Sequence, residues 1–427
     1  MKRAWKMLTG MPLFVGSHLV REVALVYQRY IFFGTLEAAA FGAASVAVAP
    51  ALFGVSFLTM LTGELVISCH SKLRSVPARR DAVKYILFLE VAGMSILALG
   101  MLLAAALLPA HLAHYRTPLF VSVLIMPASA FNQIAINWAL LSGRRSLYGT
   151  AFYIESALIL AGSQWLIDQA GLLAVPLAYC LRPMVLTTYI VFSLGVGRVT
   201  RELRHLLHEG RVKRGREVHV QFAHQVGSLL IKSAWTSLDV MMVAVFAGEK
   251  GAGHYRILKT LASVPSVLIS PVWGWLRPNI ARAIRERKHV QLARTVVNYS
   301  FLLSLPAAVM VFVPTGYFDA VYHRVFPRGD LPVGILKTSM ILWWLVASGA
   351  GWARSLSVAA GQIQASTYGN ILAFGGTFLL GPALVIWGGF NPIYVVPATL
   401  VWLNIYWFYY LARFAQKGPA QLAEATS

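Results

Sequence analysis

Nine basic side chains lie inside stretches of sequence that are otherwise apolar, and such charges need an anionic partner or water. An ionised group at the centre of a bilayer costs on the order of 3 kcal/mol even on a lenient insertion scale. Four acidic residues lie at similar depth, so the basic groups are in excess. This excess is suited to binding an anion such as a phosphate or a sugar acid. The basic residues are Arg21, Arg29, Arg182, Lys232, Arg256, Lys259, Arg277, Lys337 and Arg354, and the acidic ones are Glu22, Glu90, Glu155 and Asp239.

Depth separates these charges into two groups. Some lie near the end of an apolar stretch, where a long side chain can extend to the lipid headgroups; these are Arg29, Arg277, Lys337 and Arg354, together with Glu90 about two turns from an end. The charges that lie midway along a stretch cannot reach the headgroups in this way. They are Arg21, Arg182 and Lys232.

Spacing adds to this interpretation. Arg256 and Lys259 are three residues apart, on one face of a helix, where like charges repel and a shared anion would relieve the repulsion. Lys232 and Asp239 are seven apart, which puts them on nearly one face of a continuous helix. The alternative interpretation is that these charges form internal ion pairs that only fix helix packing.

The elements that must position these charges are transmembrane helices. The chain has 427 residues, 58% apolar and 12% charged, with a mean hydropathy of +0.64, whereas a soluble domain carries roughly 25% charged residues. The net charge is +21, from 37 Lys and Arg against 16 Asp and Glu. In a soluble protein this charge would indicate nucleic acid binding. In a membrane protein it indicates cytoplasmic loops, contact with anionic membrane lipids and an anionic substrate, and no nucleic acid.

Hydropathy predicts an all-α integral membrane protein with about twelve spans of roughly 20 residues each. With both termini in the cytoplasm, the predicted cytoplasmic segments contain 24 Lys and Arg and the external loops contain four, as the positive-inside rule requires. The basic segment 206–219 divides the chain into an N-terminal six-helix bundle, 1–205, and a C-terminal one, 220–427. A weak internal repeat supports the division, since Phe32-Phe33-Gly34 precedes Phe41-Gly42 much as Phe246-Ala247-Gly248 precedes Ala252-Gly253.

Enzymatic chemistry is not expected. The two cysteines, Cys69 and Cys180, form no metal or redox motif, and no loop carries paired carboxylates or a nucleophile motif. The sequence therefore predicts no metal site and no cofactor other than a coupling ion, H⁺ or Na⁺.

The segment Asp239 to Arg282 carries a family resemblance. It reads DVMMVAVFAGEKGAGHYRILKTLASVPSVLISPVWGWLRPNIAR, in which an Asp-led span ends in a glycine loop and Ala252-Gly253-His254-Tyr255 opens the next helix. This resembles the start of the C-terminal half of Wzx-type polysaccharide and O-antigen flippases. They belong to the multidrug/oligosaccharidyl-lipid/polysaccharide exporter superfamily, together with lipid II flippases and MATE transporters.

The resemblance implies a V-shaped pair of six-helix bundles in the bacterial cytoplasmic membrane, with a cationic cavity for a polyprenyl-pyrophosphate-linked oligosaccharide, as in lipopolysaccharide synthesis. The expected substrate-binding residues are Arg21, Arg256 and Lys259, with Arg29, Arg182 and Lys232 as secondary contacts. The expected ion-coupling residues are Asp239, Glu22 and Glu155. Glycosyltransferases or a polymerase of the same pathway are the expected protein partners. Span two lacks the arginine of the lipid II branch, which favours a different oligosaccharide.

Two other functions remain open from the sequence. A MATE-type, cation-coupled exporter of small molecules has the same architecture, although such exporters usually handle cationic drugs, which a surplus of interior Arg and Lys disfavours. A polymerase or ligase of lipid-linked glycans would act on the same substrates, but those enzymes generally have a large external loop with basic residues.

Overall fold

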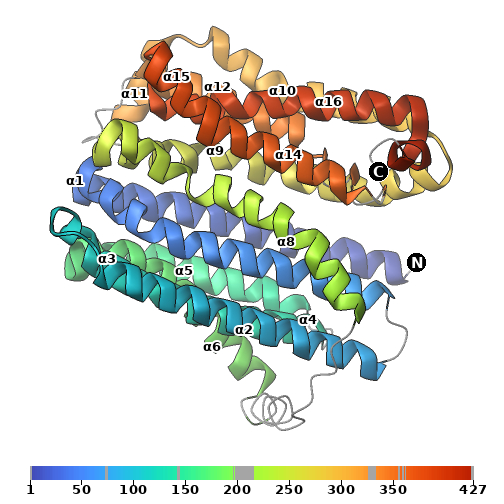
Figure 1. Cartoon of the computed structure of the whole chain (residues 1–427), viewed down its shortest axis with the longest axis horizontal. Coiled ribbons are helices and arrows are strands. Elements are labelled where there is room, and N and C mark those ends of the chain that lie inside the picture. The colour runs from blue at the N-terminus through green and yellow to red at the C-terminus, as the bar shows by residue number, and fades with distance from the viewer. Residues whose placement is uncertain are drawn as a thin grey trace. The chain divides into compact units, whose positions relative to one another are not determined.

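The computed structural model describes residues 2–72, 76–141, 145–195, 197, 216–325, 333–353, 356–357, 360 and 362–424, and within these ranges every regular element is a helix. In the N-terminal part the helices are α1 (Lys2–Lys72), α2 (Val76–Ala106), η1 (Ala110–Tyr115), α3 (Arg116–Val123), α4 (Ile125–Leu141), α5 (Arg145–Ala170), η2 (Gly171–Leu173), α6 (Ala174–Leu194) and α8 (Arg216–Ser237). They continue with α9 (Asp239–Arg285), α10 (His289–Phe312), α11 (Thr315–Val325), α12 (Val333–Ala350), α14 (Ile363–Gly375), η3 (Gly376–Leu380), α15 (Gly381–Gly388) and α16 (Pro392–Glu424). Figure 1 shows the long helices of each part running side by side.

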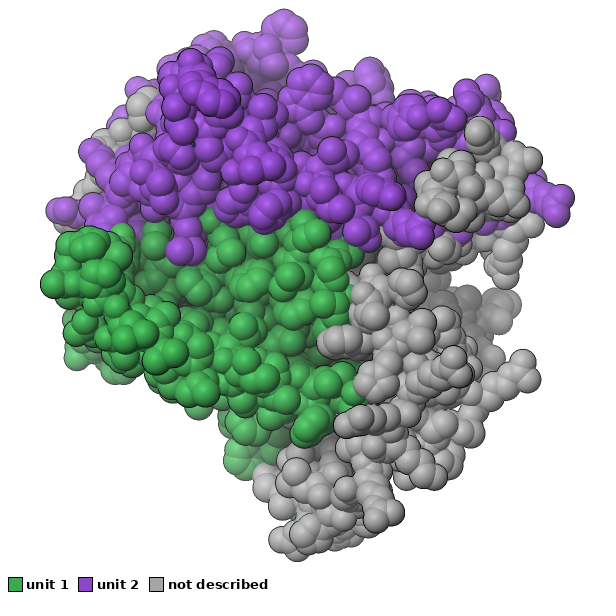
Figure 2. Space-filling view, viewed as in Figure 1, with its two compact units in different colours: residues 1–36, 43–238 green, residues 37–42, 239–427 purple. Residues whose placement is uncertain are grey.

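The chain folds as two compact units, coloured separately in Figure 2. Unit 1 contains residues 1–36 and 43–238, and unit 2 contains 37–42 and 239–427. The units therefore divide the chain between Leu238 and Asp239, and α8 belongs to unit 1. Most of the predicted linker 206–219 lies outside the described residues, so the predicted bundle boundaries remain a prediction.

The described helices are long and apolar enough to cross a membrane. Eight stretches qualify, of which three are 36 to 45 residues long, about twice what a bilayer core needs. Each of these three contains a break: at Glu37, at η2 and at Gly248. Divided at these breaks, the eight stretches give eleven segments. Helices α3 and α4, which lie between the second and third stretches, together add one more, so the described residues match the predicted number of about twelve spans. The prediction of an all-α, multi-pass membrane protein is confirmed.

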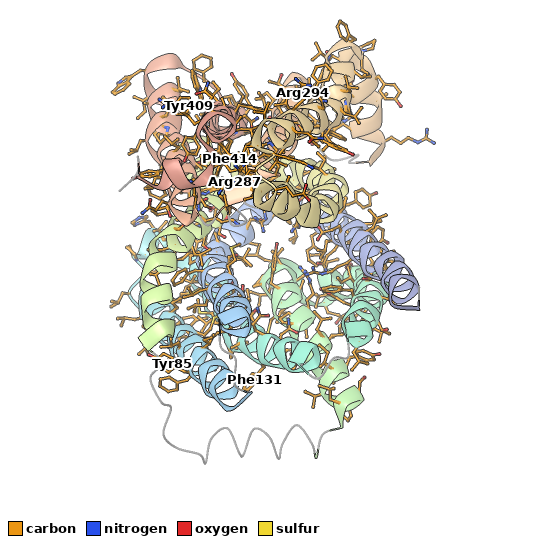
Figure 3. All side chains as sticks on the ribbon, turned by 90° about the vertical axis from the view of Figure 1, so that its right-hand side faces the viewer. Tyr85, Phe131, Arg287, Arg294, Tyr409 and Phe414 are labelled. Atoms are coloured by element: carbon orange, nitrogen blue, oxygen red, sulfur yellow. The ribbon has the colours of Figure 1, made fainter. Side chains whose placement is uncertain are left out.

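The surface of these helices is apolar. Large hydrophobic side chains such as Phe312 and Trp387 are about 85% exposed, and Figure 3 shows Phe131 and Tyr409, which are also exposed. Soluble monomers rarely show apolar patches of this extent, whereas a lipid-facing surface needs them.

The internal repeat appears in the backbone, although not in the register expected from the sequence. Helix α1 bends at Glu37 (φ 65, ψ 164) and α9 bends at Gly248 (φ 66, ψ −174). Gly42 and Gly253 each follow their bend by five residues, so both pairs are 211 residues apart. Gly34 was expected to correspond to Gly248, but it lies three residues before the bend.

Gly42 and Gly253 mark a close helix crossing inside unit 2. A Cβ on Gly42 would lie 1.8 Å from the carbonyl oxygen of Glu249, and a Cβ on Gly253 would lie 2.0 Å from that of Ala38. Ala38 and Glu249 are themselves 211 residues apart, so the two contacts are equivalent under the repeat. Only glycine fits at these two positions, because each backbone packs directly on the other.

Candidate functional site: two charged clusters within the spans

A series of contacts between α1 and α5 positions the first cluster. Tyr153 Oη lies 2.9 Å from where a Cβ on Gly16 would be, and further along the helices Ala24 and Leu25 pack on Ile159. One turn beyond, Gln28 Nε2 donates to Ser163 Oγ at 3.2 Å. Residue numbers rise together on both helices, so these segments run parallel. Arg21 and Glu155 lie between the first two contacts.

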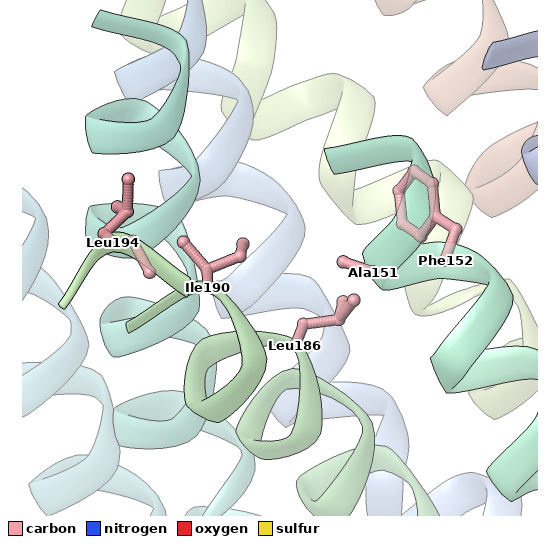
Figure 4. Close-up of a cluster of buried hydrophobic side chains, with 6 residues drawn as sticks. Ala151, Phe152, Leu186, Ile190 and Leu194 are labelled. Carbon is pink, nitrogen blue, oxygen red and sulfur yellow. The ribbon is translucent and has the colours of Figure 1, made fainter. Parts of the chain in front are cut away.

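Helices α4, α5 and α6 form the other wall of this cluster. A buried apolar cluster joins Ala135 of α4, Ala151 and Phe152 of α5 and three residues of α6, one turn apart, shown in Figure 4: Leu186, Ile190 and Leu194. This packing holds the ring of Phe152 beneath Arg21, whose Cζ lies 4.6 Å from the ring centroid. The ring adds a cation–π attraction of about 1 kcal/mol or more.

Two guanidinium groups share one buried carboxylate in this cluster. Arg182 Nε donates to Glu155 Oε1 at 2.8 Å, and Arg21 Nε lies 3.1 Å from Glu155 Oε2. The Glu155 side chain is 1% exposed, against 15% for Arg182 and 23% for Arg21. Arg29 Nη2 donates to Tyr179 Oη at 3.4 Å, and Tyr179 also lies under Arg182, 5.8 Å from Cζ. The four ionised groups named here sum to a formal charge of +2.

The second cluster lies at the start of α9, in unit 2. Buried Asp239 accepts hydrogen bonds from Tyr255 Oη and, at 2.5 Å, from Lys259 Nζ, and its Oδ1 accepts from Val240 N at 3.0 Å. Asp239 and Tyr255 would be about 24 Å apart on a straight helix. The bend at Gly248 is therefore what brings Lys259 and Tyr255 back to Asp239.

Lys232 and Asp239 do not lie on one continuous helix, so the reason for predicting a shared helix face does not hold. Helix α8 ends at Ser237 and α9 begins at Asp239, because the Asp239 carboxylate satisfies the first amide of α9 and starts a new helix. Asp239 pairs with Lys259 instead. Lys232 and Glu22 have no ion-pair partner among the described residues, and neither joins the two clusters.

The remaining predicted charges have varied positions. Arg256 is partly buried on α9, one turn before Lys259, and its carbonyl accepts from Thr260 Oγ1 at 2.8 Å. Lys337 Nζ donates to the carbonyls of Val311 and Val313 at the end of α10, which is a structural role. The side chain of Arg277 and the whole of Arg354 lie outside the described part.

Sequence reasoning missed the aromatic members of both clusters: Phe152, Tyr179 and Tyr255. A detectable signal existed, because Tyr179 and Arg182 are three residues apart, as are Phe152 and Glu155, and each pair therefore shares a helix face.

The arrangement favours an anion over a metal ion. Among the described residues no three His, Cys, Asp or Glu side chains gather where a metal ion could bind. In each cluster a single carboxylate is held by basic and aromatic side chains. The first cluster has an excess of cations, and its more exposed side chains, Arg21 and Arg182, carry it, whereas the Lys259–Asp239 pair of the second cluster is neutral. Partly exposed guanidinium groups of this kind bind phosphate or carboxylate oxygens.

Solved structures of MATE transporters match nearly the whole chain. An inward-facing multidrug resistance MATE family transporter of the MOP superfamily matches with a TM-score of 0.61 and 13% identity, over 95% of this chain and 94% of the other. An outward-facing one matches with 0.60 and 14%, over 97% and 96%. A Vibrio cholerae MATE transporter matches with 0.59 and 14%, over 98% of both chains. The chain has the MATE transporter fold.

One curated protein resembles part of the sequence. The amylovoran biosynthesis protein AmsL of Erwinia amylovora is 28% identical over 154 residues, which are 35% of this chain and 38% of AmsL. The alignment therefore spans well under half of that relative. No protein-family profile matches the chain.

Proposed function

We propose that this protein is a flippase that moves a polyprenyl-pyrophosphate-linked oligosaccharide from the cytoplasmic to the external leaflet of the bacterial cytoplasmic membrane. The observation that carries the proposal is the first cluster, in which two partly exposed guanidinium groups share one buried carboxylate inside membrane-spanning helices. The similarity to AmsL, a protein of polysaccharide biosynthesis by name, supports the glycan part of the proposal.

The physical argument concerns the cost of moving the head group. A pyrophosphate dianion cannot enter hydrocarbon without compensating charge. Arg21 and Arg182 would bind the anion, with Arg29 as a further contact in unit 1. Arg256, Lys259 and Lys232 remain candidate binding residues. Glu155 and Asp239 would fix the orientation of the cations and keep them ionised when the anion leaves. Alternation of the fold between inward-open and outward-open states would then change which leaflet the anion faces.

The proposal is tested by the sidedness of lipid-linked glycan in cells with and without the protein. Inside-out and right-side-out vesicles are probed with a membrane-impermeant lectin. We expect the glycan to accumulate on the cytoplasmic face when the protein is absent. Unchanged sidedness, with altered glycan length or attachment, would reject a flippase in favour of a polymerase, ligase or accessory protein.

Replacing Arg21 by Ala should reduce export at least tenfold, because it removes a cation while Arg182 still pairs with Glu155. The same lectin assay measures it, and membrane levels of the variant show that it inserts. The matched control is Arg294→Ala, since Arg294 is an exposed arginine outside both clusters, labelled in Figure 3. Normal export by Arg21→Ala would remove Arg21 from the mechanism.

A second candidate function, cation-coupled export of small molecules, is favoured by the likeness to MATE structures. The net positive charge of the first cluster disfavours the cationic drugs that such exporters usually carry. Drug susceptibility separates the two functions: loss of the protein should leave it unchanged if the flippase proposal is correct and increase it if the protein exports drugs.

A further inference from the structure

A carboxyl group outside both clusters is enclosed in unit 1. Glu90 of α2 is 1% exposed, and neither of its oxygens has a hydrogen-bond partner among the described residues. From the sequence this residue was expected to reach water, since it lies about two turns into its span. The structure contradicts that expectation, because helices pack over it.

The seam around Glu90 is formed by α2 and the second half of α1. Ile86 and Leu61 lie in one buried cluster, a Cβ on Gly93 would lie 2.9 Å from Leu58, and a Cβ on Gly54 would lie 2.9 Å from Leu97. Numbers rise on α2 as they fall on α1, so the helices are antiparallel. Glu90 lies between the first two of these contacts.

Helix α8 closes the third side of the seam. Leu229 packs into the cluster of Ile86 and Leu61, with Tyr85 completing it, and Val226 lies against it. Helix α8 leads along the chain directly to the break at Leu238 and thus to α9. Any change in the seam therefore acts on the helix that connects unit 1 to unit 2.

Few of the described side chains on the elements around Glu90 are ionisable. The described side chains of α1 between 43 and 62, and those of α4, include none. Among the side chains that the structure describes, α8 contributes Lys232 and α2 contributes Tyr85, and neither bonds to Glu90. Helix α3, which also packs on α2, contributes Arg116, which is exposed and donates to Leu108 O at 3.0 Å.

The hydroxyl of Thr62, on the α1 side of the seam, does not hydrogen-bond to Glu90. Its single proton is donated to Leu58 O at 2.9 Å, so towards Glu90 it can act only as an acceptor. A protonated carboxyl can donate to that hydroxyl, whereas a carboxylate cannot.

A charged Glu90 is incompatible with the closed seam. An ionised carboxylate buried without a partner is strongly destabilised, so the proton can leave only when the seam opens and water enters. Proton binding and closure of α8 on α1 and α2 are therefore linked, because the closed state holds the proton more tightly.

We propose that Glu90 is the proton-binding site through which a proton gradient drives the conformational cycle of this transporter. That the cycle transports a substrate rests on the proposed function, whereas the coupling of Glu90 protonation to closure of the seam does not. The site differs from the acidic residues expected from the sequence for ion coupling, since Glu155 and Asp239 are held by basic side chains.

Two measurements on the purified full-length protein in lipid nanodiscs test the site without any glycan. Infrared spectroscopy detects the C=O band of a protonated carboxyl, and Glu90→Gln should remove it near neutral pH. The matched control is Asp168→Asn, since Asp168 is an exposed carboxylate of unit 1 that accepts from Gln164. For the second measurement, Cys69 and Cys180 are replaced by Ser, and spin labels are placed at the exposed positions Val91 on α2 and Leu230 on α8.

The distance between the labels should lengthen as the pH is raised in the wild-type sequence, because deprotonation opens the seam. Glu90→Gln, a neutral isostere, should keep the short distance at every pH, and Glu90→Asp should restore the transition. An unchanged infrared band in Glu90→Gln, or a distance transition like that of the wild type, overturns the proposal. If the lectin assay shows glycan translocation while Glu90→Gln matches the wild type in both measurements, the proposal of a proton site at Glu90 is rejected and the flippase proposal is retained.

Discussion

Single carboxylates organise the charge of this protein. Glu155 holds two arginines, and Asp239 holds a lysine and a tyrosine. In both cases the carboxylate is buried and its basic partners are more exposed. At Glu155 two cations share one carboxylate, which leaves positive charge available to an anion, whereas the Asp239–Lys259 pair is neutral.

Breaking the Asp239 pair should destabilise the protein. Lys259→Met leaves a buried carboxylate without its counter-ion, at a cost of about 3–5 kcal/mol. Asp239→Asn with Lys259→Met should recover most of this, because no unpaired charge remains. Thermal unfolding of the detergent-purified variants measures both. Equal melting temperatures for Lys259→Met and the wild type would show that the pair contributes nothing to stability.

The sequence predicted which charged residues belong to the clusters better than it predicted which residues they pair with. Arg21, Arg182 and Lys259 were singled out because charge is rare in a membrane, and each lies in a cluster. Their pairing could not be derived, because Glu155 with Arg21 joins α5 to α1 across 134 positions and only the packing of these helices decides it. The burial of Glu90 could not be predicted, because the depth of a residue along a span does not reveal which face of the helix other helices cover.

At the scale of helices, two bends and one crossing shape unit 2. Both bends have a backbone conformation that is essentially restricted to glycine. The chain has glycine at 248 but glutamate at 37, so the N-terminal bend carries strain that the C-terminal one does not. The repeat could be predicted from the Phe-Gly and Ala-Gly pairs, but its register could not, because the bend at Glu37 has no glycine to reveal it.

Exchanging residues at the bends should therefore have opposite effects. Glu37→Gly should stabilise the protein by about 1 kcal/mol through relief of strain, and Gly248→Ala should destabilise it by a similar amount. Melting temperatures measure both effects. A higher melting temperature for Gly248→Ala would contradict the explanation of the bends by backbone strain.

At the crossing, Gly253→Val should prevent folding, whereas Gly34→Ala, with open space around the new Cβ, should be tolerated. Size-exclusion profiles of the two variants measure this difference.

At the scale of the whole molecule, hydropathy and loop charge were enough to predict the fold class. Twelve apolar windows and a 24-to-4 distribution of basic residues specify a multi-pass bundle without any knowledge of contacts. The two compact units meet between Leu238 and Asp239, and α8 packs with unit 1 through Leu229 although it follows the basic linker in the chain. The fold alone does not choose between a drug and a glycan as substrate; the net positive charge of the first cluster is suited to an anionic group.

The most direct test of this conclusion is translocation by the purified protein in proteoliposomes that contain a fluorescent polyprenyl-pyrophosphate-linked oligosaccharide. A membrane-impermeant quencher reports how much lipid remains in the outer leaflet over time. We predict rapid redistribution with the wild-type protein and with Arg294→Ala, and at least tenfold slower redistribution with Arg21→Ala or Arg182→Ala. Redistribution no faster than in protein-free liposomes, or equal rates for all four proteins, would contradict a flippase that acts through the Arg21–Glu155–Arg182 cluster.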